Sequence, residues 1–148
     1  MSYDPGLFQD LNCPLYRGVK YGRSPVEVSN QETRAVAAGT GALYFALDLE
    51  TSRKETEHEE NIEIYKFTPL KSFKTLNLES YCEVKGIEPE KCYAGAQSLG
   101  KSIHQLYGDK IQAACYPSQK DSRGIVVVIF PSNVSDRLET LFDISRVT

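Results

Sequence analysis

Residues 125–130 read Ile-Val-Val-Val-Ile-Phe, and this run constrains the fold more than any other part of the sequence. It is almost wholly β-branched, which favours a strand because branched side chains pack well on a pleated surface. It contains no polar position, so both faces of the strand must be buried. The run therefore predicts a strand near the centre of a sheet.

The rest of the chain alternates short strand patterns with short helical patterns. Strands are expected at residues 15–21, 42–47, 62–67 and 74–78, the last with Leu76 and Leu78 on one face. Helices are expected at residues 49–60 after an Asp48 cap, at 93–107, and at 136–142 after a Ser135 cap. No repeat or low-complexity linker interrupts this order, so one α+β domain over residues 1–148 is predicted.

Composition excludes several function classes. With 17 Lys+Arg against 20 Asp+Glu the net charge is −3, whereas non-specific nucleic-acid binding needs a cationic surplus. No apolar run is long enough to span a membrane, and the first residues do not resemble an export signal, so a cytoplasmic location is expected. The spacing of Cys13, Cys82, Cys92 and Cys115 does not match a zinc site; we expect reduced thiols and no metal.

Three polar side chains recur at regular intervals before the middle of the chain. Arg34 is followed after 10 residues by Tyr44, and Tyr44 after 11 by Glu55. Taken singly, Tyr44 in an apolar run is typical of a core, and Glu55 in a glutamate-rich helix is typical of a solvated face. Farther on, a Tyr-Pro-Ser turn at residues 116–118 precedes the hydrophobic strand.

This ordered set resembles the RES domain, a family of bacterial toxins that degrade NAD+. In that family an Arg in a glycine-rich loop precedes, at the same offsets, a Tyr on a strand and a Glu on the next helix. Arg17 in Leu-Tyr-Arg-Gly resembles the Arg of the family's first strand. The resemblance covers a core of about residues 15–133. Around Arg34 the chain departs from the usual Gly-Gly-Arg-Trp-Asn-Pro and reads Glu-Thr-Arg-Ala-Val-Ala.

The resemblance implies an ADP-ribosyltransferase-like fold, in which small mixed or antiparallel sheets and a few short helices flank an NAD+ cleft. NAD+ would be the substrate, and no cofactor is expected. Glu55 would face the cation that develops at the ribose, Tyr44 would stack on nicotinamide, and Ser118 would hydrogen-bond nearby. Arg34 and Arg17 would hold the pyrophosphate. Further substrate contacts are expected from Tyr93 and Gln97.

The function implied is cleavage of the nicotinamide–ribose bond with water or phosphate as acceptor, which depletes NAD+ in a bacterial cytoplasm. A cognate antitoxin, or an immunity protein if the chain is a delivered effector, would cover the cleft. Two alternatives keep the fold: transfer of ADP-ribose to a macromolecule, and a non-catalytic module that binds NAD+ or a partner.

Overall fold

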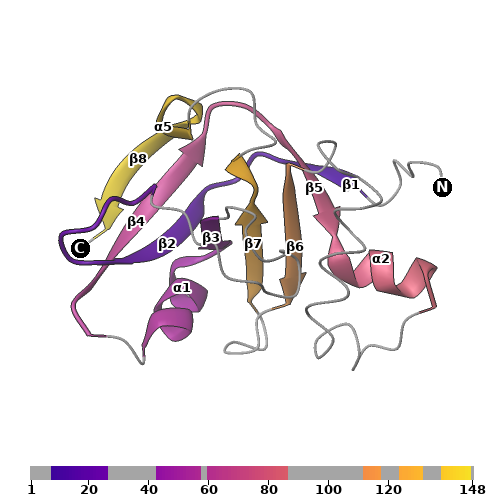
Figure 1. Cartoon of the computed structure of the whole chain (residues 1–148), viewed down its shortest axis with the longest axis horizontal. Helices are drawn as coiled ribbons and strands as arrows, with labels where there is room; N and C mark the ends of the chain where they lie inside the picture. The colour runs from indigo at the N-terminus through magenta and orange to yellow at the C-terminus, as the bar shows by residue number, and fades with distance from the viewer. Residues whose placement is uncertain are drawn as a thin grey trace.

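The computed structural model describes residues 8–26, 43–57, 60–86, 112–117, 124–131 and 138–147. In this part of the chain eight strands form one curled mixed sheet, accompanied by three short helices (Figure 1). The strands are β1 (Phe8–Leu11), β2 (Leu15–Lys20), β3 (Leu43–Ala46), β4 (Ile62–Pro69), β5 (Phe73–Asn77), β6 (Ala113–Pro117), β7 (Ile125–Ile129) and β8 (Phe142–Val147). The helices are α1 (Leu49–Thr56), α2 (Leu78–Val84) and α5 (Leu138–Leu141). The predicted α+β class is confirmed.

Strand β7 occupies the middle of the sheet, as its composition predicts. The order of strands is β1-β5-β6-β7-β3-β2-β4-β8, and only β5 and β6 pair in parallel among the described strands. Val127, Val128 and Ile129 are all fully buried, so both faces of β7 are covered. Removing so much apolar surface from water makes this strand a main source of the sheet's stability.

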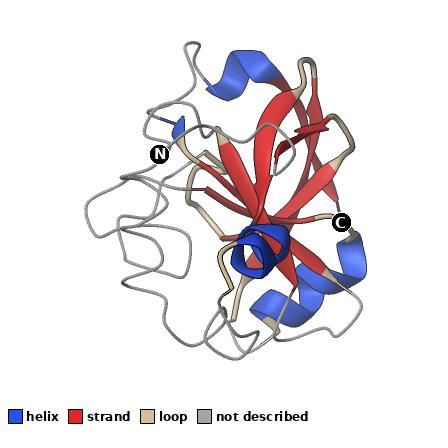
Figure 2. Cartoon of the chain, turned by 90° about the vertical axis from the view of Figure 1, so that its right-hand side faces the viewer, coloured by secondary structure: helices blue, strands red, loops and turns tan. Residues whose placement is uncertain are grey.

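The sheet curls around a cluster of phenylalanine rings. Phe67 lies on β4 and Phe73 on β5, which are far apart in the order of strands. Nevertheless Phe142 contacts both rings, each with a centroid distance of 5.2 Å, and Phe45 packs against Phe67 at 4.8 Å. Strands so distant in the sheet can share one ring only if the sheet bends over it. Figure 2 shows the strong twist of the strands that accompanies this bend.

The small sheets that the resemblance implies are joined into one sheet, and the junction between β2 and β3 is narrow. In the described residues β2 and β3 are joined by one register pair, Tyr16 with Ala46, whereas β2 pairs with β4 along its whole length. Strands that share so few ladder bonds can diverge from each other. This narrow junction, the β2–β3 seam, borders a cavity that Tyr16 and Ala46 both line.

Several local expectations are wrong at their boundaries. Helix α1 ends at Thr56 and not at residue 60. Asn61 is in a left-handed conformation (φ 57°), which an α-helix does not contain, and it directly precedes β4. Strand β5 stops at Asn77, whose side chain accepts a hydrogen bond from the Ser80 amide and caps α2, a helix the sequence pattern did not predict. Leu78 therefore begins a helix instead of sharing a strand face with Leu76.

Tertiary pairing also creates strands that the local pattern did not indicate. The expected helix at 136–142 is described only as Leu138–Leu141, and Phe142 begins β8, which pairs with β4. Strand β1 pairs with β5, and Tyr116 belongs to strand β6, not to a turn. The expected helix at 93–107 and the Ser135 cap lie outside the described residues.

The cysteines differ from the expectation of four reduced thiols. Cys82, on α2, is disulfide-bonded, whereas Cys13 and Cys115 are free. Burial raises the pKa of the Cys115 thiol, because the thiolate would lose its hydration inside the sheet. No helix in the described part of the chain is long and apolar enough to cross a membrane.

Candidate active site

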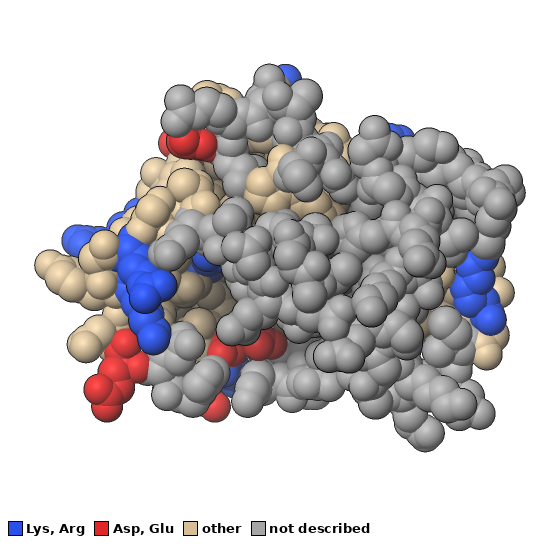
Figure 3. Space-filling view, in the orientation of Figure 1, with Lys and Arg blue, Asp and Glu red and all other residues tan. Residues whose placement is uncertain are grey.

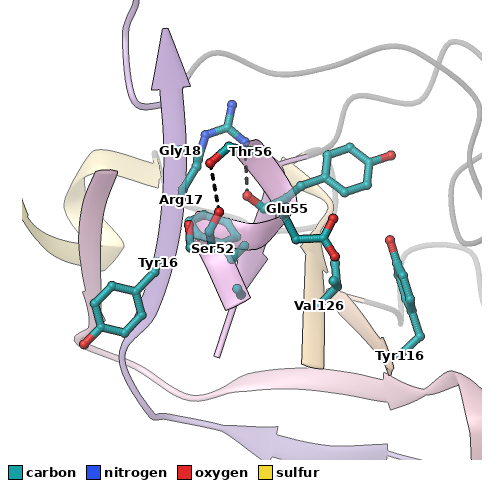
Figure 4. Close-up of a pocket in the computed structure, with 11 residues that line it drawn as sticks. Tyr16, Arg17, Gly18, Ser52, Glu55, Thr56, Tyr116 and Val126 are labelled. Carbon is teal, nitrogen blue, oxygen red and sulfur yellow. Dashed lines mark hydrogen bonds between the residues drawn. The ribbon is translucent and has the colours of Figure 1, made fainter. Parts of the chain in front are cut away.

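The floor of the site is one row of side chains that crosses four strands. Tyr16 on β2 pairs with Ala46 on β3, Ala46 with Val126 on β7, and Val126 with Tyr116 on β6. Residues paired across antiparallel strands point to the same face of a sheet. The row therefore places two small side chains between two tyrosines, and all four line one cavity (Figure 4).

Helix α1 forms the wall above this floor. Asp48 caps it by accepting hydrogen bonds from the Thr51 amide (2.7 Å) and the Thr51 hydroxyl (2.9 Å), as the sequence predicts for the amide. The last turn presents Glu55 and Thr56 to the cavity, and the Thr56 hydroxyl donates to the Ser52 carbonyl at 2.9 Å. The helix thus holds the Glu55 carboxylate at the site.

Two glycines let α1 lie close against the sheet. A Cβ on Gly18 would stand 2.7 Å from the Thr56 methyl, and a Cβ on Gly124 would collide with the buried Thr51 side chain. Glycine is needed at both positions because any larger residue would push the helix outward. The position of Glu55 therefore depends on glycines in β2 and before β7.

Arg17 lies at the β2–β3 seam. Its Nη1 donates a hydrogen bond to the Tyr44 carbonyl at 3.4 Å, and its guanidinium carbon is 6.0 Å from the centre of the Phe45 ring. This hydrogen bond joins a side chain of β2 to the backbone of β3, because a guanidinium carries several N–H donors that can reach a neighbouring strand. Arg17 thus ties β2 to β3 at the wall of the cavity.

The cavity has a volume of about 310 Å³, at the lower end of the range for small-molecule sites. It brings together Arg17, Tyr44 and Glu55, three residues that the sequence analysis assigned to one site. Each comes from a different element: β2, β3 and α1. Arg34, Ser118, Tyr93 and Gln97 lie outside the described residues, so their assignments stay predictions.

Sequence reasoning missed Tyr116 as a lining residue. The Tyr-Pro-Ser pattern predicts a turn, and a turn does not define the direction of the tyrosine side chain. Its pairing with Val126 on β7 turns the side chain toward the cavity. Alternation of side chains along a strand that ends at residue 117 would place Tyr116 on one of the two faces of the sheet. Which face that is depends on the register with β7, which the sequence does not give.

Charges elsewhere on the described surface are mixed. Figure 3 shows basic and acidic side chains close to one another at the left of the view. Near the β4–β8 edge Arg146 forms an ion pair with Glu63 (3.4 Å), and the Tyr65 hydroxyl donates to the other Glu63 oxygen (3.0 Å). The hydrogen bond to Glu63 raises the pKa of Tyr65. Among the described residues no group of three or more His, Cys, Asp or Glu could hold a metal ion.

The described residues thus form an α+β structure in which a curled sheet carries a cavity lined by an arginine, a tyrosine and a glutamate. The model of the RES domain matches residues 17–143, and the chain belongs to that family. RES domains are known as NAD+-degrading toxins. A comparison with curated proteins finds no match.

Proposed function

We propose that this RES domain cleaves the nicotinamide–ribose bond of NAD+ with water or phosphate as acceptor, and that it acts as a toxin in a bacterial cytoplasm by depleting NAD+. One observation carries the proposal: Arg17, Tyr44 and Glu55 line one cavity although they come from three elements. An ordinary core tyrosine and a solvated helix glutamate would not converge in this way.

The chemistry of NAD+ cleavage explains why these residue types serve. Loss of nicotinamide leaves an oxocarbenium-like cation at the ribose, and a carboxylate held nearby lowers the barrier electrostatically. Glu55 supplies that carboxylate from the last turn of α1. Tyr44 offers a ring on which nicotinamide stacks. Arg17 and Arg34 are proposed to bind the pyrophosphate, with Arg17 already placed at the cavity wall.

The remaining assignments belong to the same proposal. Ser118 is assigned a hydrogen bond to the nicotinamide or the ribose, and Tyr93 and Gln97 further substrate contacts. NAD+ is a substrate here, and no cofactor is required. An antitoxin or immunity protein that covers the cavity would block entry of NAD+, so we propose such a partner for the chain.

The test is release of nicotinamide from NAD+ by the purified protein, freed of any bound inhibitor, with and without phosphate. Glu55→Gln should lower kcat about a hundredfold, the usual loss when one electrostatic contact to a transition state is removed. Glu50→Gln is the matched control, because Glu50 lies in the first turn of the same helix and is exposed. Arg34→Ala should also lose activity without unfolding.

Each other outcome points to one alternative. The cleavage reaction would be refuted if NAD+ stays intact after incubation with the purified, inhibitor-free protein, both with and without phosphate. Labelling of an acceptor with ADP-ribose would identify a transferase. Binding of NAD+ without either product would identify a non-catalytic module, which the altered sequence around Arg34 would then explain.

A further inference from the structure

Tyr116 stands at one end of the cavity floor and is held there firmly. It is 8% exposed, and its strand is bracketed by β5 on one side and β7 on the other. Its neighbour in the row is Val126, and the next is Ala46. Because these two side chains are smaller than the Tyr116 phenol, the phenol extends beyond them and forms one wall of the cavity.

The Tyr116 hydroxyl and the Glu55 carboxylate face the same space. Figure 4 shows Glu55 extending from α1 toward the side of the cavity where Tyr116 stands, with the hydroxyl end of Tyr116 turned to the level of the carboxylate. Tyr16, at the other end of the row, points away from Glu55 in the same view. One end of the cavity is therefore bounded by a carboxylate, which accepts hydrogen bonds, and a phenol, which donates or accepts them.

We propose that Tyr116 is a further substrate-contacting residue, whose hydroxyl hydrogen-bonds one hydroxyl of the nicotinamide ribose while Glu55 holds the other. The inference rests on the proposed function. A ribose carries two adjacent hydroxyls on one side of its ring, so two polar groups that bound the same end of a cavity can each take one. The small side chains of Ala46 and Val126 leave room below the sugar.

This contact would make the site selective for an intact ribose diol. A site that holds a substrate hydroxyl discriminates against an analogue that lacks it, because a polar group of the site then loses its partner. Tyr116 would thus position the ribose so that its anomeric carbon faces Glu55, while Glu55 alone stabilises the developing charge.

The experiment compares Tyr116→Phe with the wild-type chain in nicotinamide release. Loss of the hydroxyl should lower kcat/KM about tenfold, the scale of one hydrogen bond. Tyr81→Phe is the matched control, since Tyr81 is also buried but lies on α2, away from the cavity. The same comparison is then made with NAD+ analogues that lack the 2′- or the 3′-hydroxyl of the nicotinamide ribose. With the analogue that lacks the hydroxyl bound by Tyr116, the wild-type chain and Tyr116→Phe should react at equal rates.

The outcomes separate the contact from the proposed function. Wild-type kinetics for Tyr116→Phe, or an equal loss with NAD+ and both analogues, would overturn the contact and leave the function standing. If the wild-type chain releases no nicotinamide, the function fails, and calorimetry with ADP-ribose decides on the contact. Weaker ADP-ribose binding by Tyr116→Phe than by Tyr81→Phe supports it, and equal binding, or no binding by any of the proteins, refutes it.

Discussion

Substitution of Gly18 by alanine tests how α1 is held over the site. The added Cβ would lie 2.7 Å from the Thr56 methyl and 3.1 Å from both the Thr56 hydroxyl and the Ile62 methyl. Ordinary contacts of a Cβ begin at 3.4 Å, so Thr56 and β2 must separate by about 0.7 Å. Thr56 is adjacent to Glu55, and the shift is therefore passed to the carboxylate.

The expected magnitude follows from two opposing effects. Overpacking of this kind costs about 1–3 kcal/mol of stability. Alanine in place of glycine within a strand would otherwise stabilise the fold by roughly 0.5–1 kcal/mol. The net loss should be about 1 kcal/mol. Because a displacement of about 1 Å at a catalytic group costs up to a hundredfold in rate, a shift of this size should lower kcat about tenfold.

Denaturant unfolding gives the stability, and nicotinamide release gives kcat. Gly22→Ala is the matched control: Gly22 has a φ of 86° and nothing within 4 Å of the added Cβ, so it should lose stability through backbone strain but keep wild-type kcat. Thr56→Ser in the Gly18→Ala chain removes the closest methyl and retains the hydroxyl that donates to Ser52. It should restore much of the activity.

Three results would contradict this prediction. If Gly18→Ala keeps both the stability and the kcat of the wild-type chain, close packing of β2 against Thr56 does not hold the helix. If Thr56→Ser leaves the loss of activity unchanged, the methyl contact is not its cause. A Gly22→Ala protein that loses kcat as well would show that activity follows global stability and not the position of α1.

The remaining predictions concern the helix cap and an ionisable pair. Asp48→Ala should cost about 1 kcal/mol in denaturant unfolding and lower kcat, because α1 loses its cap, whereas Asp48→Asn should keep most of both; equal stability of the two variants would contradict the cap. The hydrogen bond to Glu63 raises the pKa of Tyr65 above the ordinary tyrosine value of 10.0. The stability that this hydrogen bond contributes is therefore fully present below pH 10.0 and is lost as the pH rises through the raised pKa. Thermal melts should therefore show a smaller loss of stability above pH 10.0 for Tyr65→Phe than for the wild-type chain, and parallel losses would disprove the coupling.

Features that depend on neighbours in the sequence could be predicted well. The branched run at residues 125–130 indicated a buried central strand, and Asp48 indicated the start of α1, because both signals act over a few residues. The intervals from Arg34 to Tyr44 and Glu55, together with Arg17 in its Leu-Tyr-Arg-Gly context, indicated a shared site through resemblance to a family. The described members of that set, Arg17, Tyr44 and Glu55, line one cavity. In contrast, β1, α2 and β8 have weak local patterns and escaped prediction.

What only the tertiary structure decided is the pairing of distant strands. Phe142 was expected in a helix, but its ring packs between Phe67 and Phe73 in the curled sheet, so the chain there extends as β8. Tyr116 turns toward Glu55 only because its strand is in register with β7. Local sequence determines periodicity and caps, whereas register and curvature depend on contacts across many residues. For that reason the sequence by itself determined the central strand and the candidate residues, and the fold decided how they face one cavity.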